Sequence, residues 1–156
     1  MMKRWRRRAV TDAIPIYTCA RPGRGRFGPQ AQVPDSEVIR WLSELPKHRP
    51  LSIISLLGHK PDGMDEHAFY SFRDASGFQK WLGRQLEGTV NLFSHPTTDF
   101  GRVDSVTVMA IRSNLDQELS LGRTVVIVDS GGVQRTGQIC REFGLIEDTR
   151  TLPQEP

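Results

Sequence analysis

The stretch VVIVDSGGVQRTGQIC, residues 125–140, carries the strongest fold signal in the chain. It opens with four β-branched apolar residues in succession, which is typical of a strand buried on both faces of a sheet. A glycine-rich loop follows, and residues 135–143 then have helical spacing that ends at Gly144. A strand, a short loop and a helix in this order predict an α/β unit. In such sheets, ligands bind beyond the carboxyl ends of the strands.

The rest of the chain repeats this alternation of strand and helix. Apolar runs bounded by turn residues predict strands at residues 14–20, 51–58 and 89–96. Apolar residues at helical spacing predict helices at residues 35–48, 76–88 and 103–121. The connections between these segments are too short to hold a further domain. We therefore predict an α/β fold with a mostly parallel central sheet flanked by helices.

Length and charge set the domain organisation. With 156 residues, 37% of them hydrophobic and 25% charged, the chain has the size and composition of one globular domain. Its net charge of +3 is concentrated at residues 3–8, which carry five basic side chains. We predict a basic disordered arm at residues 1–12, one domain at 13–147 and a flexible tail at 148–156. Such an arm also permits electrostatic binding of nucleic acid through residues 3–8.

Other composition signals point away from membranes, metals and disulfides. No stretch approaches the roughly 20 apolar residues of a membrane helix, and residues 9–20 contain Asp12 and Pro15, unlike a signal peptide. We predict a cytoplasmic protein without membrane contact. Cys19 and Cys140 are expected to be buried thiols, and the four histidines have no metal-ligand spacing. No metal and no cofactor are predicted.

The glycine-rich loop, residues 129–137, has the composition of an anion-binding nest. Glycines allow successive backbone N–H groups to curl inward, and the following helix adds the positive end of its dipole. Arg135 can hold a phosphate through two hydrogen bonds. The alternative is a plain strand-to-helix turn in which glycine serves geometry only. In either case, the acidic Asp129 at the mouth of the loop needs an explanation.

The loop resembles the signature of the cysteine-dependent protein tyrosine and dual-specificity phosphatases. That signature reads His-Cys, five residues, Arg, Ser or Thr, then Gly. Five residues separate Asp129 from Arg135, and Thr136 and Gly137 complete the pattern. The resemblance implies a tyrosine-phosphatase-like fold over roughly residues 14–143. It also implies that phosphate is bound by Ser130, Gly131, Gly132, Val133, Gln134 and Arg135, while Thr136 assists release of the phosphoenzyme.

A second motif, HPTTDFG at residues 95–101, resembles the loop that carries the general acid in small dual-specificity members. The resemblance assigns that role to Asp99, thirty residues before Asp129 and separated from it by a predicted helix and strand. The alternative is that Asp99 caps the helix that starts near Gly101. In the family, the acid protonates the leaving group after a cysteine thiolate has attacked phosphorus.

The departures from the family concern the reacting groups. Asp129 stands where the family has its nucleophilic cysteine, and Val128 stands where it has the preceding histidine. Nineteen residues follow Gly137, so the predicted domain is shortened at its C-terminus relative to the family. Convergent N–H groups and Arg135 should keep Asp129 ionised. Its oxygens could then reach into the nest and accept the bonds meant for phosphate.

Three functions are compatible with this pattern. The first is a pseudophosphatase, catalytically impaired, that binds a phosphorylated protein or a small anionic phosphate ester. The second is a working hydrolase with Asp129 as nucleophile. Carboxylate nucleophiles of the haloacid-dehalogenase-like type work with a second acid two residues later, and that position is Gly131 here. The third is a non-catalytic interaction protein that binds nucleic acid through its basic arm.

Overall fold

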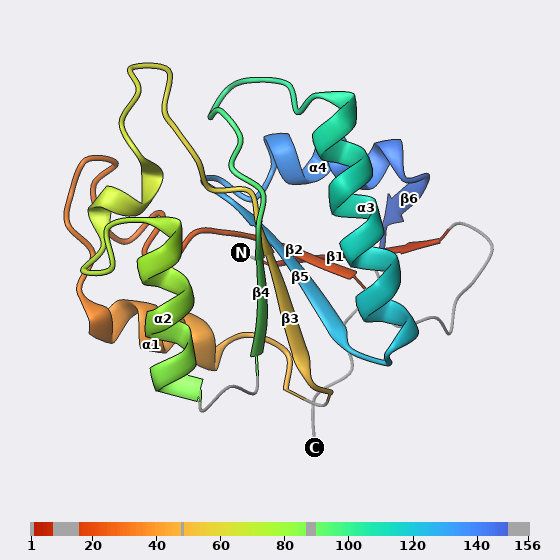
Figure 1. The fold of residues 1–156 in the computed structure, drawn as a ribbon, viewed down its shortest axis with the longest axis horizontal. Coiled ribbons are helices and arrows are strands. Elements are labelled where there is room, and N and C mark those ends of the chain that lie inside the picture. Colours follow the sequence, from red (N-terminus) through yellow and green to blue (C-terminus); the bar gives the residue numbers. More distant parts are fainter. Residues whose placement is uncertain (1, 8–15, 48, 87–89, 150–156) are drawn as a thin grey trace.

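A mixed sheet covered by helices forms the centre of the protein (Figure 1). The computed structural model describes residues 2–7, 16–47, 49–86 and 90–149. Within these ranges the strands are β1 (Lys3–Arg7), β2 (Ile16–Ala20), β3 (Leu51–Ser55), β4 (Val90–Ser94), β5 (Thr124–Asp129) and β6 (Leu145–Glu147). The helices are α1 (Asp35–Ser43), α2 (Ala75–Leu86), α3 (Ser105–Ser120) and α4 (Gln134–Glu142), with a short 3₁₀ helix, η1 (Glu66–Phe69). The predicted α/β class is confirmed.

The strands lie in the order β4-β3-β5-β2-β1-β6. The four strands predicted from their apolar runs, β2 to β5, are parallel to one another, whereas β1 and β6 add an antiparallel edge. All six residues of β5 are buried, as its β-branched sequence predicts. Because β5 lies between β3 and β2, the glycine-rich loop leaves the sheet near its middle.

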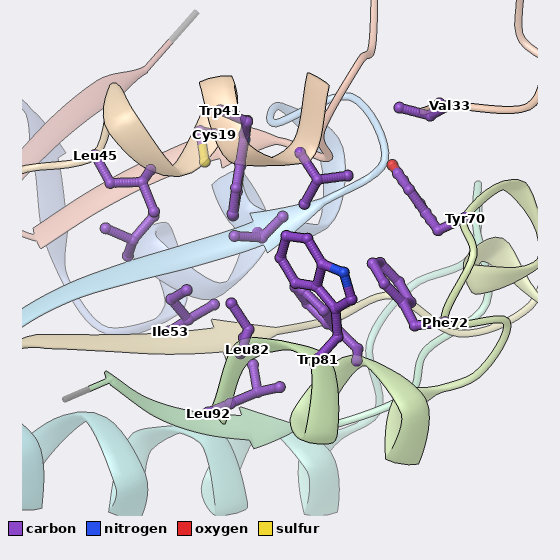
Figure 2. Close-up of a cluster of buried hydrophobic side chains, with 14 of the residues drawn as sticks. Cys19, Val33, Trp41, Leu45, Ile53, Tyr70, Phe72, Trp81, Leu82 and Leu92 are labelled. Atoms are coloured by element: carbon purple, nitrogen blue, oxygen red, sulfur yellow. The ribbon is translucent and has the colours of Figure 1, made fainter. Parts of the chain in front are cut away.

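Each face of the sheet carries its own core. The helices α1 and α2 cover one face, and α3 and α4 cover the other (Figure 1). Trp41 of α1 and Trp81 of α2 pack with Ile53 on the first face (Figure 2). Ile111 of α3 and Ile139 of α4 belong to the core of the second face. None of the helices in the described part of the chain is long and apolar enough to cross a bilayer.

The predicted basic arm is wrong for Lys3–Arg7, because these residues form β1 in the sheet. Trp5 is buried and anchors the strand, with its indole Nε1 donating to Thr18 Oγ1 at 2.9 Å. The basic side chains of β1 lie close to the carboxylate of Asp148, which follows β6. Arg4 lies 3.3 Å and Arg6 3.9 Å from the Asp148 carboxylate. Residues 8–12 of the predicted arm lie outside the described residues.

The predicted flexible tail is wrong at its first residue. Asp148 is buried, and its backbone N–H donates to the Arg4 carbonyl oxygen at 2.7 Å. This bond continues the pairing of β6 with β1. Residues 150–156 lie outside the described residues.

Candidate functional site

The site lies at the carboxyl ends of the parallel strands. The glycine-rich loop follows β5, and the loop that carries Asp99 follows β4. Segment 56–58 comes directly after β3 and lies between them: Thr97 N–H donates to the Leu56 carbonyl at 3.3 Å. Parallel pairing of β3 with both β4 and β5 brings these three loops to one edge of the sheet. This is the edge at which α/β sheets bind ligands.

The Asp129 carboxylate occupies the nest formed by the glycine-rich loop. One oxygen, Oδ1, accepts a hydrogen bond from the Gly132 N–H. The other, Oδ2, accepts from the Arg135 N–H at 2.9 Å and the Thr136 N–H at 3.0 Å. The side chain is 1% exposed. The expectation that Asp129 reaches into its own loop is confirmed, because its oxygens take backbone donors that a phosphoryl group would need.

Gly132 fixes how the loop sits on the sheet. Its φ is +74°, in the left-handed region that favours glycine. A Cβ at this position would lie 2.5 Å from the Ala20 backbone nitrogen and 2.7 Å from the Cys19 carbonyl carbon. Glycine is therefore required both by the turn and by the close approach to β2, so the Gly132 N–H is held in position for Asp129.

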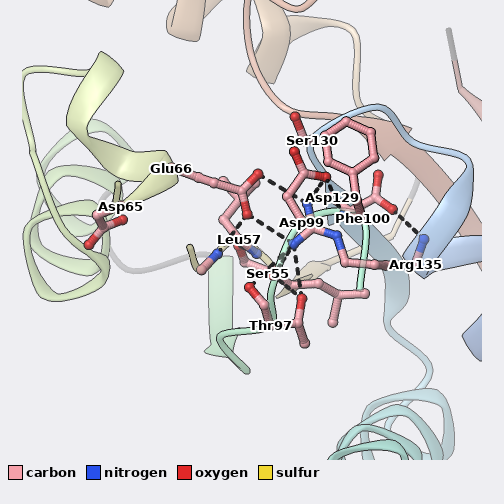
Figure 3. A network of polar contacts seen from close by, with 12 residues as sticks. Ser55, Leu57, Asp65, Glu66, Thr97, Asp99, Phe100, Asp129, Ser130 and Arg135 are labelled. Atoms are coloured by element: carbon pink, nitrogen blue, oxygen red, sulfur yellow. Dashed lines mark hydrogen bonds and ion pairs between the residues drawn. The ribbon is translucent and has the colours of Figure 1, made fainter. Parts of the chain in front are cut away.

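The Arg135 guanidinium does not face the nest. It makes a two-bond contact with Glu66, Nη1 to Oε1 at 2.9 Å and Nη2 to Oε2 at 3.0 Å (Figure 3). Nη2 also donates to Asp99 Oδ1 at 3.3 Å, and Nη1 donates to Thr97 Oγ1 at 3.0 Å. Arg135 and Glu66 are each 1% exposed. The arginine thus ties η1 and the Asp99 loop to the start of α4.

Glu66 is the member of this site that the sequence did not indicate. It lies in an irregular segment, and η1 brings it to the site because Asp65 caps that turn by accepting from the His67 N–H at 2.8 Å. Its Oε1 also accepts from the Gly58 N–H at 3.0 Å. The available signal was chemical: a buried arginine is commonly paired with a carboxylate, but the motif does not say which one.

Asp99 is held against Arg135 and does not cap α3. Its Oδ1 accepts from the Phe100 N–H at 3.1 Å, and the residue is 8% exposed. The cap of α3 is Asp104, which accepts from the Thr107 N–H at 2.8 Å. That bond and others from the start of the helix lower the pKa of Asp104. The predicted alternative of Asp99 as a helix cap is wrong.

The remaining residues of the loop divide into a buried and an exposed set. Ser130 is buried, and its hydroxyl accepts from Arg24 Nη1 at 3.3 Å. The Thr136 hydroxyl is buried and has no hydrogen-bond partner among the residues that the structure describes. Gly131, Val133 and Gln134 lie on the surface. The site therefore brings together Asp129, Ser130, Gly132, Arg135, Thr136 and Asp99 from the predicted set.

The charge of the site disfavours a second anion. Two carboxylates, those of Glu66 and Asp99, contact the Arg135 guanidinium, and a third, that of Asp129, accepts from the backbone N–H of the same residue. Like charges at this range repel strongly where water is excluded. A phosphate dianion entering the loop would have to displace Asp129 and would still meet two further carboxylates.

Neither thiol of the chain is available as a nucleophile at neutral pH. Both cysteines are free and buried, as predicted. Burial raises the pKa of Cys19 to about 12 and that of Cys140 to about 12, so both stay protonated at neutral pH. The described part of the chain contains no group of three or more His, Cys, Asp or Glu side chains placed to hold a metal ion. Comparison of the chain with protein-family models, curated proteins and solved structures found no match.

Proposed function

We propose that the chain is a domain of the tyrosine and dual-specificity phosphatase type that does not turn over phosphate esters. It acts as a pseudophosphatase and binds a phosphorylated protein or another anionic ligand. One observation carries the absence of turnover in this proposal: the Asp129 carboxylate accepts three backbone N–H bonds inside the glycine-rich loop. The spacing of Asp129, Arg135 and Thr136 supports the family, and the occupied nest argues against ordinary catalysis.

The alternative of Asp129 as a working nucleophile is disfavoured by the same bonds. An attacking carboxylate oxygen needs a lone pair directed at phosphorus, and the phosphoryl oxygens need donors to stabilise the developing charge. Here the donors of the loop hold the would-be nucleophile, and Arg135 is held by Glu66 and Asp99. Gly131, two residues after Asp129, provides no second acid.

The alternative of a nucleic-acid-binding arm is disfavoured by the pairing of β1. Lys3 lies 3.9 Å from Glu147, and both Arg4 and Arg6 lie within 4 Å of Asp148. A strand whose cations already face carboxylates releases fewer counterions on contact with a phosphate backbone.

The test is to return the family's reacting groups to the loop. We expect no hydrolysis of p-nitrophenyl phosphate by the native protein. We expect measurable metal-independent turnover by Asp129→Cys, which increases when Val128→His is added, because the thiolate then lies among the loop amides. Asp129→Ser is the matched control, since it vacates the nest without supplying a strong nucleophile and should remain inactive. Native turnover that Asp129→Asn abolishes would instead identify a working carboxylate enzyme.

A further inference from the structure

A cavity lies beside the glycine-rich loop, on the side of α1. Its volume is about 260 Å³, and it lies between the loop that follows β2 and helix α1. Four arginines line it: Arg21, Arg24, Arg26 and Arg40. We call it the arginine pocket. Arg24 connects it to the site described above, because its Nη1 donates to the hydroxyl of Ser130.

Two of the four arginines are neutralised within the pocket. Arg26 lies 3.2 Å from the Glu37 carboxylate, and Arg40 lies 2.9 Å from the Glu44 carboxylate. Both glutamates also line the cavity. These pairs cancel in charge, so the net positive charge of the pocket comes from Arg21 and Arg24.

Arg21 is a buried cation without an acidic partner. It is 3% exposed, its Nη1 donates to the Tyr70 hydroxyl at 3.0 Å, and its guanidinium lies over the Phe69 ring at 4.8 Å. Its Nε is buried without a hydrogen-bond partner, and no carboxylate lies within 4 Å of its guanidinium within the described ranges. A buried charge is costly when it is unpaired. The pocket thus lacks the counter-charge that the Arg135 site has in excess.

Arg24 is the accessible partner of Arg21. It is exposed, and the Ser130 hydroxyl is the one side-chain partner found for its guanidinium in the described part of the chain. The other donors of this planar group are therefore available to a ligand. Guanidinium groups match phosphate oxygens in two-bond contacts, and two arginines together balance a dianion.

We propose that the arginine pocket is an anion site that binds a phosphate monoester, with Arg24 and Arg21 as its cationic ligands and Ser130 at its edge. This inference rests on the proposed function, since it places the phosphorylated ligand beside the glycine-rich loop and not within it. The concave wall and the depth of Arg21 suit a single phosphate group. They do not suit the continuous backbone of a duplex, which needs charges along an exposed face.

Trp41 provides a built-in reporter of this pocket. It lines the cavity, and its indole Nε1 donates to the Ala20 carbonyl at 3.0 Å. Inorganic phosphate is titrated into the full chain at constant ionic strength, and the Trp41 indole N–H resonance is followed by NMR. We expect a saturable shift in the native protein. In Arg24→Gln we expect about tenfold weaker affinity, the effect of losing one charge-assisted contact.

Three controls make the result decisive. Arg84→Gln removes an exposed arginine on α2 and should leave phosphate affinity unchanged. A short glycine-flanked phosphoserine peptide distinguishes the source of the phosphate: tighter binding than inorganic phosphate indicates a phosphorylated protein, and equal binding indicates a free ion. Thermal unfolding of Arg24→Gln checks that the exposed substitution leaves the fold intact.

The outcomes separate the two proposals. A native protein without a saturable Trp41 shift, or an Arg24→Gln variant that binds as tightly as the native one, overturns the arginine pocket. Neither result affects the gain of turnover in Asp129→Cys, which tests the glycine-rich loop. Conversely, loss of affinity in Arg24→Gln supports the pocket even where Asp129→Cys stays inactive.

Discussion

The glycine-rich loop and the arginine pocket are neighbours that meet at Ser130, and they differ in how their positive groups are satisfied. In the loop, backbone N–H groups face Asp129, and Arg135 faces Glu66 and Asp99. In the pocket, the buried guanidinium of Arg21 has no carboxylate within 4 Å among the described residues. A motif rich in donors is therefore not by itself an anion site. What matters is which donors remain after the protein has formed its own contacts.

The largest expected difference between the two regions is in stability. Arg135→Met should lower the free energy of unfolding by about 3–5 kcal/mol, because Glu66 is left buried without its cation. Arg24→Gln, on the exposed side of the pocket, should stay within about 0.5 kcal/mol of the native protein. Urea unfolding measures both. Adding Glu66→Leu to Arg135→Met should recover part of the lost free energy of unfolding. Equal losses in Arg135→Met and Arg24→Gln would contradict the contrast between the loop and the pocket.

The next largest effect concerns the occupied nest. Asp129→Ser removes three bonds from the carboxylate and should cost about 2–4 kcal/mol. The vacated amides should then accept phosphate, so the unfolding midpoint of this variant should rise with added inorganic phosphate. The measurement is made in the Arg24→Gln background, which weakens phosphate binding in the pocket, and the rise is compared with that of Arg24→Gln alone. If phosphate leaves the midpoint of the double variant unchanged, the loop is not a latent phosphate site.

A smaller effect concerns the pH dependence of stability and comes from the two buried thiols. One lines the arginine pocket, and the other lies in the helix that follows the glycine-rich loop. Cys19 lines the arginine pocket and Cys140 lies in α4, and burial raises the pKa of each from 9.0 to about 12. The unfolded thiols ionise near pH 9 while the folded ones stay neutral, so stability is lost as the pH rises above 9. Each thiol should lower the free energy of unfolding by about 1 kcal/mol between pH 9 and pH 10.

The interval between pH 9 and pH 10 also distinguishes the contribution of the thiols from that of Tyr70. Its pKa is raised by burial to about 12 from 10.0, so it contributes mainly above pH 10. Cys19→Ala and Cys140→Ala should each reduce the slope of unfolding free energy against pH between 9 and 10. An unchanged slope in both variants would show that the thiols are not the groups that titrate.

The smallest effect provides an exposed reference for carboxylate-to-amide bonds. Asp104→Ala removes the bond to the Thr107 N–H at the exposed start of α3. Its destabilisation should be less than half that of Asp129→Ser at pH 7. Because its pKa is lowered in the folded protein, this contribution should disappear as the pH falls below 3.8. A loss as large as that of Asp129→Ser would mean that burial adds nothing to the bonds in the loop.

The parallel part of the fold follows from patterns that are visible in the chain. Runs such as 125–128 are apolar without interruption, and α3 places Ile111 and Leu115 on one buried face, so the sequence pattern alone indicates these elements. The antiparallel edge has no such pattern. Only Trp5 of β1 is buried, and β6 is three residues long. Its stability depends on pairing with partners far away in the sequence, which no local window contains.

The same division holds within the site. The position of Asp129 follows from local chemistry, since an acid next to a glycine-rich turn and a helix N-terminus accepts their N–H groups. The partner of Arg135 could not be found this way. The chain has 18 acidic residues, and Glu66 is selected among them only because the 3₁₀ helix η1 brings it to the carboxyl edge of the sheet.

The place of β1 between β2 and β6 has a consequence for synthesis on the ribosome. Trp5 pairs with Glu147, so the outer edge of β1 stays unpaired until the chain has grown by some 142 residues. At about 5–20 residues per second, that interval lasts roughly 7 to 28 s. Until then, the four basic residues of Lys3–Arg7 give the open edge the kind of charge that disfavours pairing with the strands of other chains. Once Glu147 and Asp148 emerge, the same charges hold the finished edge together.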